Sequence, residues 1–217
     1  MTSIPDIIHT VAVWAAPVLF AITLHEAAHG WVAYKLGDPT AKSRGRITMN
    51  PLKHVDPMGT VAVPLFLAML SPFIIGWAKP VPVEPRYFKS PLLDMALVAV
   101  AGPASNFLMA CFWALSIQAS ALLLEPSSLL SFMEEMGRNG IIINAVLMVL
   151  NLIPIPPLDG GRVVAGVLPL SLAMQFIRLE KYGMLIILLL LFSGLLGKIM
   201  WPLVQYFVNV IGSIFVL

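Results

Sequence analysis

The sequence predicts an all-α polytopic membrane protein, with about five to six transmembrane helices, a re-entrant segment and short membrane-associated β-strands. Of its 217 residues, 59% are hydrophobic and only 11% are charged, and the mean hydropathy is +0.91. A soluble domain carries about 25% charged residues. The net charge of +2 is too small to indicate a nucleic-acid partner. The whole chain, 1–217, is therefore expected to form one integral membrane domain whose immediate partner is the lipid bilayer.

Apolar runs separated by polar, proline-containing connections divide this domain into parts. About twenty apolar residues are needed to cross a bilayer as a helix. On this basis the expected parts are a first helix at 7–36, a re-entrant region at 40–91, and helices at 92–124, 140–170 and 182–217, the last divided into two. The first helix ends where Gly37-Asp38-Pro39 interrupts the apolar pattern.

The run at 59–78 is the least regular of the apolar segments. Pro64 and Pro72 interrupt it, and a proline-rich stretch follows in which Val81 and Val83 are expected to form short extended strands. We therefore expect this run to enter the membrane, turn near Pro72 and return. Non-helical backbone is tolerated at this depth only where protein or a water-filled cavity covers it.

The distribution of lysine and arginine favours the re-entrant path. If 59–78 crossed the membrane fully, the 13 basic residues would divide almost evenly between the two faces. If the segment returns, all of them except Arg138 and Lys198 lie on one side. The positive-inside rule favours the second arrangement. It predicts an external N-terminus and a first helix that ends in the cytoplasm.

A cluster of ionisable residues lies within the first apolar run. Its sequence is HEAAH, at 25–29. His25 and His29 are four residues apart and so share one helix face, where one Zn²⁺ ion can take both imidazoles. Glu26 follows the first histidine directly, as in helical zinc motifs whose glutamate is the general base. Ionisable groups at membrane depth are costly, so a functional role is the default expectation for them.

Zinc in a catalytic site takes three protein ligands and keeps a fourth position open. Asp159 is the best third candidate in the chain. It follows Pro154, Pro156 and Pro157, which should unwind the helix locally, and it precedes a pair of glycines. A zinc ion held by two histidines and this aspartate would polarise a carbonyl and activate water, with Glu26 as general base.

Three elements together resemble the site-2 protease family of intramembrane zinc metalloproteases, in the short prokaryotic form without a PDZ domain. They are HEAAH at 25–29, AGPASN at 101–106 and NLIPIPPLDGGR at 151–162, in family order. The resemblance implies that His25, His29 and Asp159 bind one zinc ion per chain and that Glu26 is catalytic. It implies as substrate a transmembrane protein cut in or near the bilayer, at an active site toward the cytoplasmic side of a prokaryotic cell membrane.

The same resemblance singles out three further residues. For Asn106 and Asn151 it implies active-site roles, either in holding the substrate backbone or in supporting a metal ligand, although asparagines also bond across membrane helices. His54 lies in a segment that looks like the short form of the family. Three roles stay open for it: a group that supports the site, an additional metal ligand or an ordinary loop histidine. Asn144 is expected to be structural.

Two other functions remain open at this point. The same ligands could serve a membrane zinc-binding or transport protein without proteolytic activity, or a non-catalytic protein that binds membrane helices. Against transport, the chain has no histidine-rich loop and no second line of ionisable residues through the membrane. Metal movement that survives Glu26→Gln would favour transport over proteolysis.

Overall fold

The computed structural model describes residues 3–62 and 79–215. Within these ranges the chain is helical and contains no β-strand, so the predicted all-helical class is confirmed. The expected turn of the re-entrant run near Pro72 lies outside the described residues. The main helices are α1 (Ile4–Lys35), α4 (Pro91–Leu123), α5 (Ser128–Asn151), α6 (Asp159–Val167), α7 (Leu170–Ile177), α8 (Glu180–Phe192) and α9 (Leu195–Phe215).

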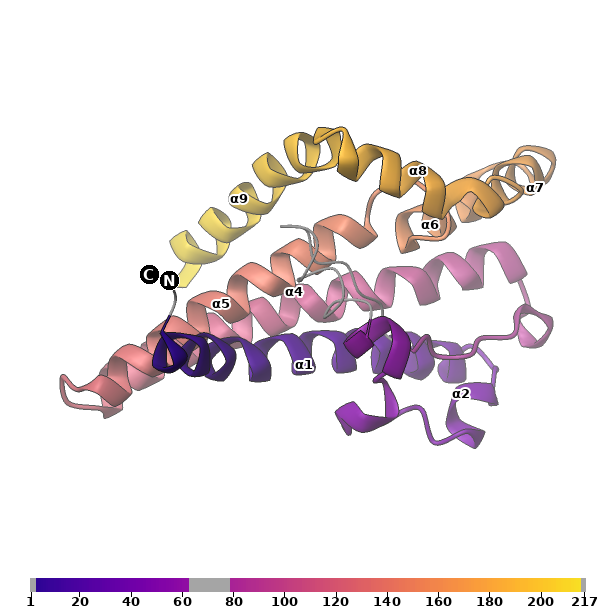
Figure 1. The fold of residues 1–217 in the computed structure, drawn as a ribbon. Coiled ribbons are helices and arrows are strands. Elements are labelled where there is room, and N and C mark those ends of the chain that lie inside the picture. The colour runs from indigo at the N-terminus through magenta and orange to yellow at the C-terminus, as the bar shows by residue number, and fades with distance from the viewer. Residues whose placement is uncertain (1–2, 63–78, 216–217) are drawn as a thin grey trace.

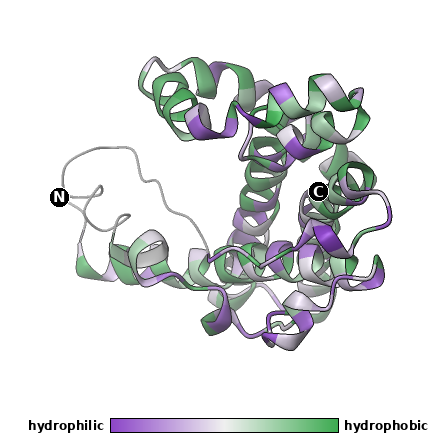
Figure 2. Ribbon diagram, turned by 90° about the vertical axis from the view of Figure 1, so that its right-hand side faces the viewer, coloured by the Kyte–Doolittle hydropathy of each residue, from purple (hydrophilic) through white to green (hydrophobic). Residues whose placement is uncertain are grey.

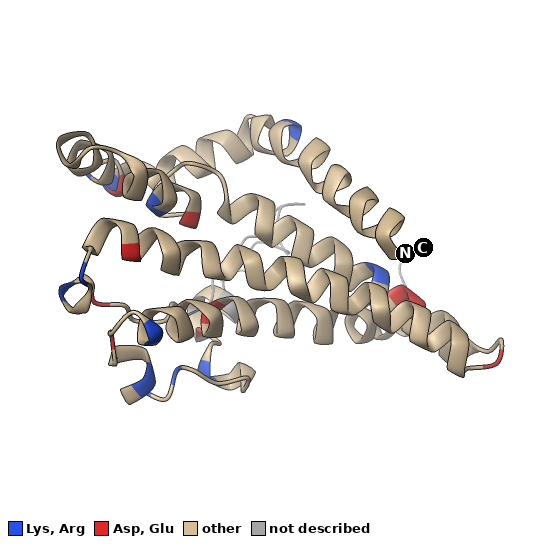
Figure 3. Ribbon diagram, turned by 180° about the vertical axis from the view of Figure 1, so that it is seen from behind, with Lys and Arg blue, Asp and Glu red and all other residues tan. Residues whose placement is uncertain are grey.

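Short elements connect the first two long helices. They are α2 (Thr40–Ser43), η1 (Pro51–Lys53), η2 (Pro57–Ala62) and η3 (Pro85–Tyr87). Figure 1 shows them grouped beside the C-terminal half of α1, while α8 and α9 arch over the opposite side of the bundle. Charged residues lie mostly near helix ends and in connections (Figure 3), and hydrophobic residues dominate the helices (Figure 2).

Local sequence signals set the ends of these helices. Ser3 and Asp6 form a capping box that starts α1. The helix ends at Lys35, and Gly37 follows the C-cap residue Leu36 with a φ of 110°, which glycine adopts at little cost. The side chain of Ser127 caps α5 by accepting from the Leu130 N–H at 3.3 Å. Helix α5 therefore begins at Ser128, twelve residues before the start of the helix expected at 140–170, and its first turns include Glu134 and Glu135.

The core is built where α4 packs against α1, α5 and α6. Trp113 of α4 packs with Ile141 of α5 and Ile211 of α9 in one buried cluster. Val204 of α9 joins Met148 of α5 in a second. These clusters hold α4, α5 and α9 together, and α1 packs against both α4 and α5. Helix α6 follows the prolines that come after α5 and packs against α4.

Three of the described helices are long and apolar enough to cross a membrane: Ile4–Lys35, Pro91–Leu123 and Leu195–Phe215. This supports a membrane protein. The larger number of spans expected from the sequence stays a prediction.

The expected strands around Val81 and Val83 are wrong for the described structure, where 79–84 is irregular. Two of its backbone donors bond side chains, and the Lys79 N–H donates to the His54 carbonyl at 2.9 Å. The Val81 N–H donates to Glu26 Oε2 at 2.8 Å, and the Glu84 N–H donates to Asp38 Oδ2 at 2.7 Å. Pro80 and Pro82 have no N–H, which removes two donors that a ladder would need.

Candidate metal centre

Two helices bring three metal-binding side chains to one point. His25 and His29 lie one turn apart on α1, and Asp159 is the first residue of α6. Their ligand atoms all lie within 4.8 Å of one another, and each residue is buried, with an exposed fraction of 7% or less. Asp159 Oδ2 is 3.3 Å from Nε2 of each histidine, and the two Nε2 atoms are 3.0 Å apart. Residues 130 or more positions apart in the chain thus form one potential metal site.

The outer nitrogens of both imidazoles contact oxygen atoms. His25 Nδ1 lies 2.7 Å from Asn106 Oδ1, and His29 Nδ1 lies 2.7 Å from the Val98 carbonyl oxygen. A carbonyl oxygen can only accept, so each Nδ1 must carry the proton and donate it. The orientation of the Asn106 amide follows from its own bonds, because its Nδ2 donates to the Ala21 carbonyl and to Asn144 Oδ1. In the neutral imidazoles both Nε2 atoms are therefore lone-pair acceptors.

Three acceptors without a proton between them repel one another unless a cation is shared. Asp159 Oδ2 is buried and has no hydrogen-bond partner among the described residues. A tetrahedral zinc ion with bonds of about 2.0–2.1 Å needs ligand atoms about 3.3 Å apart, close to the separations of 3.0 and 3.3 Å here. The donor set of two imidazoles and one carboxylate also suits zinc. The residues fit the metal.

Gly102 of α4 allows the two histidines to lie against that helix. A Cβ atom at this position would be 2.5 Å from His25 Cε1 and from His29 Cε1 and Nε2. Any side chain at 102 would therefore displace the ligand rings. The glycine is a steric requirement of the site.

Glu26 accepts a hydrogen bond from the connection between α1 and α4. Its Oε2 accepts the Val81 N–H at 2.8 Å. The segment that provides this donor is held in turn by Arg46, whose Nη2 donates to the Lys79 carbonyl at 2.6 Å and to the Pro80 carbonyl at 3.4 Å. One carboxylate oxygen of Glu26, the residue that follows His25 in the chain, is thus held by the backbone N–H of Val81.

Comparison with known proteins identifies relatives whose names describe them as zinc metalloproteases. No family model and no solved structure matches the chain. The chain is 37% identical over 190 residues to "Putative zinc metalloprotease YwhC" of Bacillus subtilis, which covers 87% of this chain and 84% of that protein. The chain belongs to this zinc metalloprotease family. It is also 28% identical over 205 residues to "Putative zinc metalloprotease Rip2" of Mycolicibacterium smegmatis, covering 89% of this chain and 72% of that protein.

The metalloprotease is thus a zinc-dependent hydrolase of peptide bonds, and the His25, His29 and Asp159 group is where its metal can bind. The structure brings one further expected residue, Asn106, into contact with this group, through its bond to His25. Asn106 is fully buried between α1 and α5. A hydrogen bond to the outer nitrogen of a ligand fixes the ring orientation and its tautomer.

Two of the residues expected in the site, Asn151 and His54, form hydrogen bonds within their own helix or loop. The Asn151 amide donates to the Leu147 carbonyl, one turn back on α5, at 2.9 Å. His54 is buried, and its Nε2 lies 3.1 Å from the Thr48 carbonyl of its own loop. Burial lowers the pKa of the His54 imidazole, so it is neutral at pH 7 and its buried Nδ1 is an acceptor without a partner among the described residues.

Sequence reasoning missed several supporting groups of the metalloprotease. Asn144, which we expect to be structural, is fully buried; its Oδ1 accepts from Asn106 and its Nδ2 donates to the Gly140 carbonyl at 2.8 Å. The Val98 carbonyl and the Val81 N–H are backbone groups, which leave no trace in side-chain identity. Gly102 was visible only as part of a motif. For Asn144 the available signal was its position seven residues before Asn151, two helical turns away on the same face of α5.

Gly102→Ala is expected to displace the histidine rings and weaken zinc binding at least about tenfold. Gly197→Ala is a matched control, because a Cβ atom there would meet nothing within 4 Å. Zinc retained by the purified protein after dialysis against a competing chelator measures the effect, with thermal unfolding to confirm that both variants fold. Equal zinc retention by Gly102→Ala and the wild type would contradict the steric role assigned to Gly102.

Proposed function

We propose that this zinc metalloprotease is an intramembrane endopeptidase of the site-2 protease type. It hydrolyses a peptide bond in or near a transmembrane helix of a membrane protein substrate, in a prokaryotic cell membrane, with the active site toward the cytoplasmic side. The observation that carries the proposal is the position of the metal group. His25 and His29 belong to α1, a helix long and apolar enough to cross a bilayer.

In this proposal His25, His29 and Asp159 hold zinc. When bound, zinc supplies a Lewis acid that polarises the scissile carbonyl and makes water a stronger acid. Glu26 takes the proton from the attacking water and later gives it to the leaving amine. The Val81 N–H occupies one Glu26 oxygen, which leaves the other oxygen to act as the base. Asn106 keeps His25 oriented toward the metal.

Burial of the ligands supports hydrolysis in a shielded environment. All three metal-binding residues are largely excluded from the surface, so electrostatic effects on the reacting groups are stronger than in bulk water. A peptide bond within a helix is protected by its own hydrogen bonds. We therefore expect the substrate helix to unwind locally before attack.

Reconstitution in lipid vesicles discriminates proteolysis from zinc transport. The wild type and Glu26→Gln are placed in vesicles with a single-pass membrane protein as substrate and a zinc-sensitive dye inside. We expect fragments of the substrate with the wild type only, and no dye response with either protein. Dye response in both proteins without any fragment would replace the endopeptidase by a transport protein.

A further inference from the structure

A basic cavity lies beside the connection between α1 and α4. Its volume is about 360 Å³, and its lining includes four cationic side chains, Arg44, Arg46, Lys53 and Lys79. No acidic residue is among those that line it in the described part of the chain. Four positive charges around one concave space create a potential that attracts an anion.

Arg46 is the buried member of this group. Only 7% of the residue is exposed, and its Nη2 atom is bound to the carbonyl oxygens of Lys79 and Pro80. Its Nε is buried without a hydrogen-bond partner, and within 3–62 and 79–215 no carboxylate forms an ion pair with its guanidinium. A buried cation without a counter-charge is costly. An anion in the cavity would offset that cost.

The surroundings of the cavity have the character of a membrane surface. At the end of α1, the Lys35 ammonium lies 5.6 Å from the centre of the Trp31 ring, and the Lys42 ammonium lies 4.1 Å from the centre of the Tyr34 ring. Exposed Trp and Tyr with basic neighbours are typical of the interface between lipid and water. Lys42 of the second pair is two residues from Arg44, which lines the cavity, so we expect the cavity to lie near that interface.

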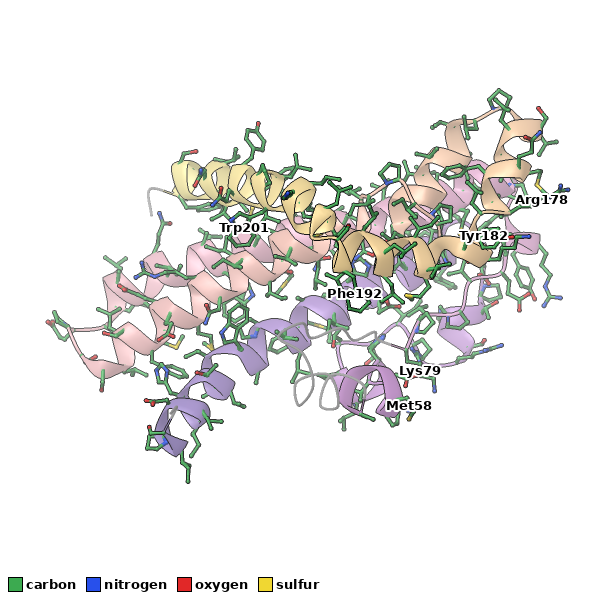
Figure 4. The ribbon with its side chains drawn as sticks, turned by 45° about the horizontal axis from the view of Figure 1, so that its top comes forward. Met58, Lys79, Arg178, Tyr182, Phe192 and Trp201 are labelled. Atoms are coloured by element: carbon green, nitrogen blue, oxygen red, sulfur yellow. The ribbon has the colours of Figure 1, made fainter. Side chains whose placement is uncertain are left out.

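Exposed apolar side chains adjoin the basic ones. Leu52 lines the cavity and is 80% exposed, and Met49 and Met58 are 63% and 64% exposed. Figure 4 shows Met58 and Lys79 on the connecting region in the lower part of the view, well away from Arg178, which follows α7. A site for a soluble anion or for an acidic peptide segment has no need of such apolar surroundings. A ligand with a phosphate and acyl chains satisfies both kinds of surface.

We propose that this cavity binds the phosphate head group of an anionic phospholipid, with its acyl chains along Leu52 and the neighbouring methionines. Arg44, Lys53 and Lys79 meet the phosphate from the exposed side, and Arg46 meets it from the buried side. The lipid would then also affect the catalytic carboxylate, a consequence that rests on the proposed function. Arg46 binds the carbonyls of residues 79 and 80, and the next N–H, that of Val81, holds Glu26.

Lipid binding is tested first and without reference to catalysis. The full chain in detergent is incubated with phosphatidylglycerol or phosphatidylcholine, and retained lipid is measured by native mass spectrometry. We expect the wild type to retain phosphatidylglycerol preferentially and Arg44→Gln/Lys53→Gln to retain at least about tenfold less. The control, Arg178→Gln/Lys181→Gln, removes two exposed charges near α7 and α8 and should match the wild type.

Three results would overturn the lipid assignment. They are equal retention by Arg44→Gln/Lys53→Gln and the wild type, displacement of phosphatidylglycerol by an equal concentration of inorganic phosphate, and its displacement by an acidic peptide of equal charge. The peptide result would assign the cavity to an acidic segment of a substrate instead.

The link to catalysis is tested separately. Glu26→Gln should retain phosphatidylglycerol as the wild type does while cleaving nothing. If no variant cleaves any substrate, the proposed function fails while the lipid site still stands or falls on retention. Wild-type cleavage in phosphatidylglycerol bilayers should exceed that in phosphatidylcholine bilayers several-fold, and the difference should disappear in Arg44→Gln/Lys53→Gln. Equal rates in both lipids would overturn the link.

Discussion

Glu26→Gln is expected to reduce peptide hydrolysis at least about a thousandfold while zinc remains bound. The amide keeps the volume of the side chain, and its oxygen can still accept the Val81 N–H that the carboxylate accepts at 2.8 Å. It cannot take a proton from water at neutral pH. Because Glu26 is not in the group of metal-binding residues, zinc content should equal that of the wild type.

The matched control is Glu84→Gln. Glu84 is another glutamate, in the connection between α1 and α4, and its carboxylate forms an ion pair with Arg86 at 2.9 Å. Activity of this variant should stay within about twofold of the wild type, because exposed ion pairs contribute little to stability. Hydrolysis by Glu26→Gln at the wild-type rate would remove Glu26 from the mechanism.

Asp159→Ala is expected to cause the largest loss of metal. The substitution removes the only carboxylate of the group and leaves two imidazoles, so one of the three protein ligands is lost. We expect zinc affinity to fall at least about a hundredfold and hydrolysis to be lost with it. Zinc content by atomic spectrometry, measured at several concentrations of free zinc, gives the affinity.

Asp159→Asn separates loss of charge from loss of shape, because the amide retains an oxygen at the same place. An intermediate zinc affinity is expected, since a neutral oxygen is a weaker zinc ligand than a carboxylate. Glu180→Gln, at the exposed start of α8, serves as the control and should bind zinc like the wild type. Unchanged zinc affinity in Asp159→Ala would mean that another residue is the third ligand.

The parts that the sequence predicted are those with a short-range signal. The spacing of His25 and His29 places both on one helix face, whatever the rest of the fold. Asp159 could be found because acidic residues are rare in this chain and because prolines and glycines frame it. The helical class followed from composition, since a bilayer permits few other structures.

The parts that the sequence could not predict depend on how helices pack. The bonds of Asn106 to His25 and Asn144 require three helices to meet at one residue, α1, α4 and α5. Periodicity within one helix contains no such information. The prediction of a strand at Val81 was wrong for a related reason. Its extended pattern was visible, but its N–H bonds a distant glutamate instead of a neighbouring strand.

Mapping the cut in a membrane-embedded substrate tests whether the protein is an intramembrane endopeptidase. The zinc-loaded wild type and Glu26→Gln at equal zinc content are reconstituted with the same single-pass protein, and the fragments are identified by intact mass. We expect a cut inside the apolar segment or within a few residues of it, made by the wild type only. A cut confined to the extramembrane tail, or the same cut made by Glu26→Gln, would contradict it.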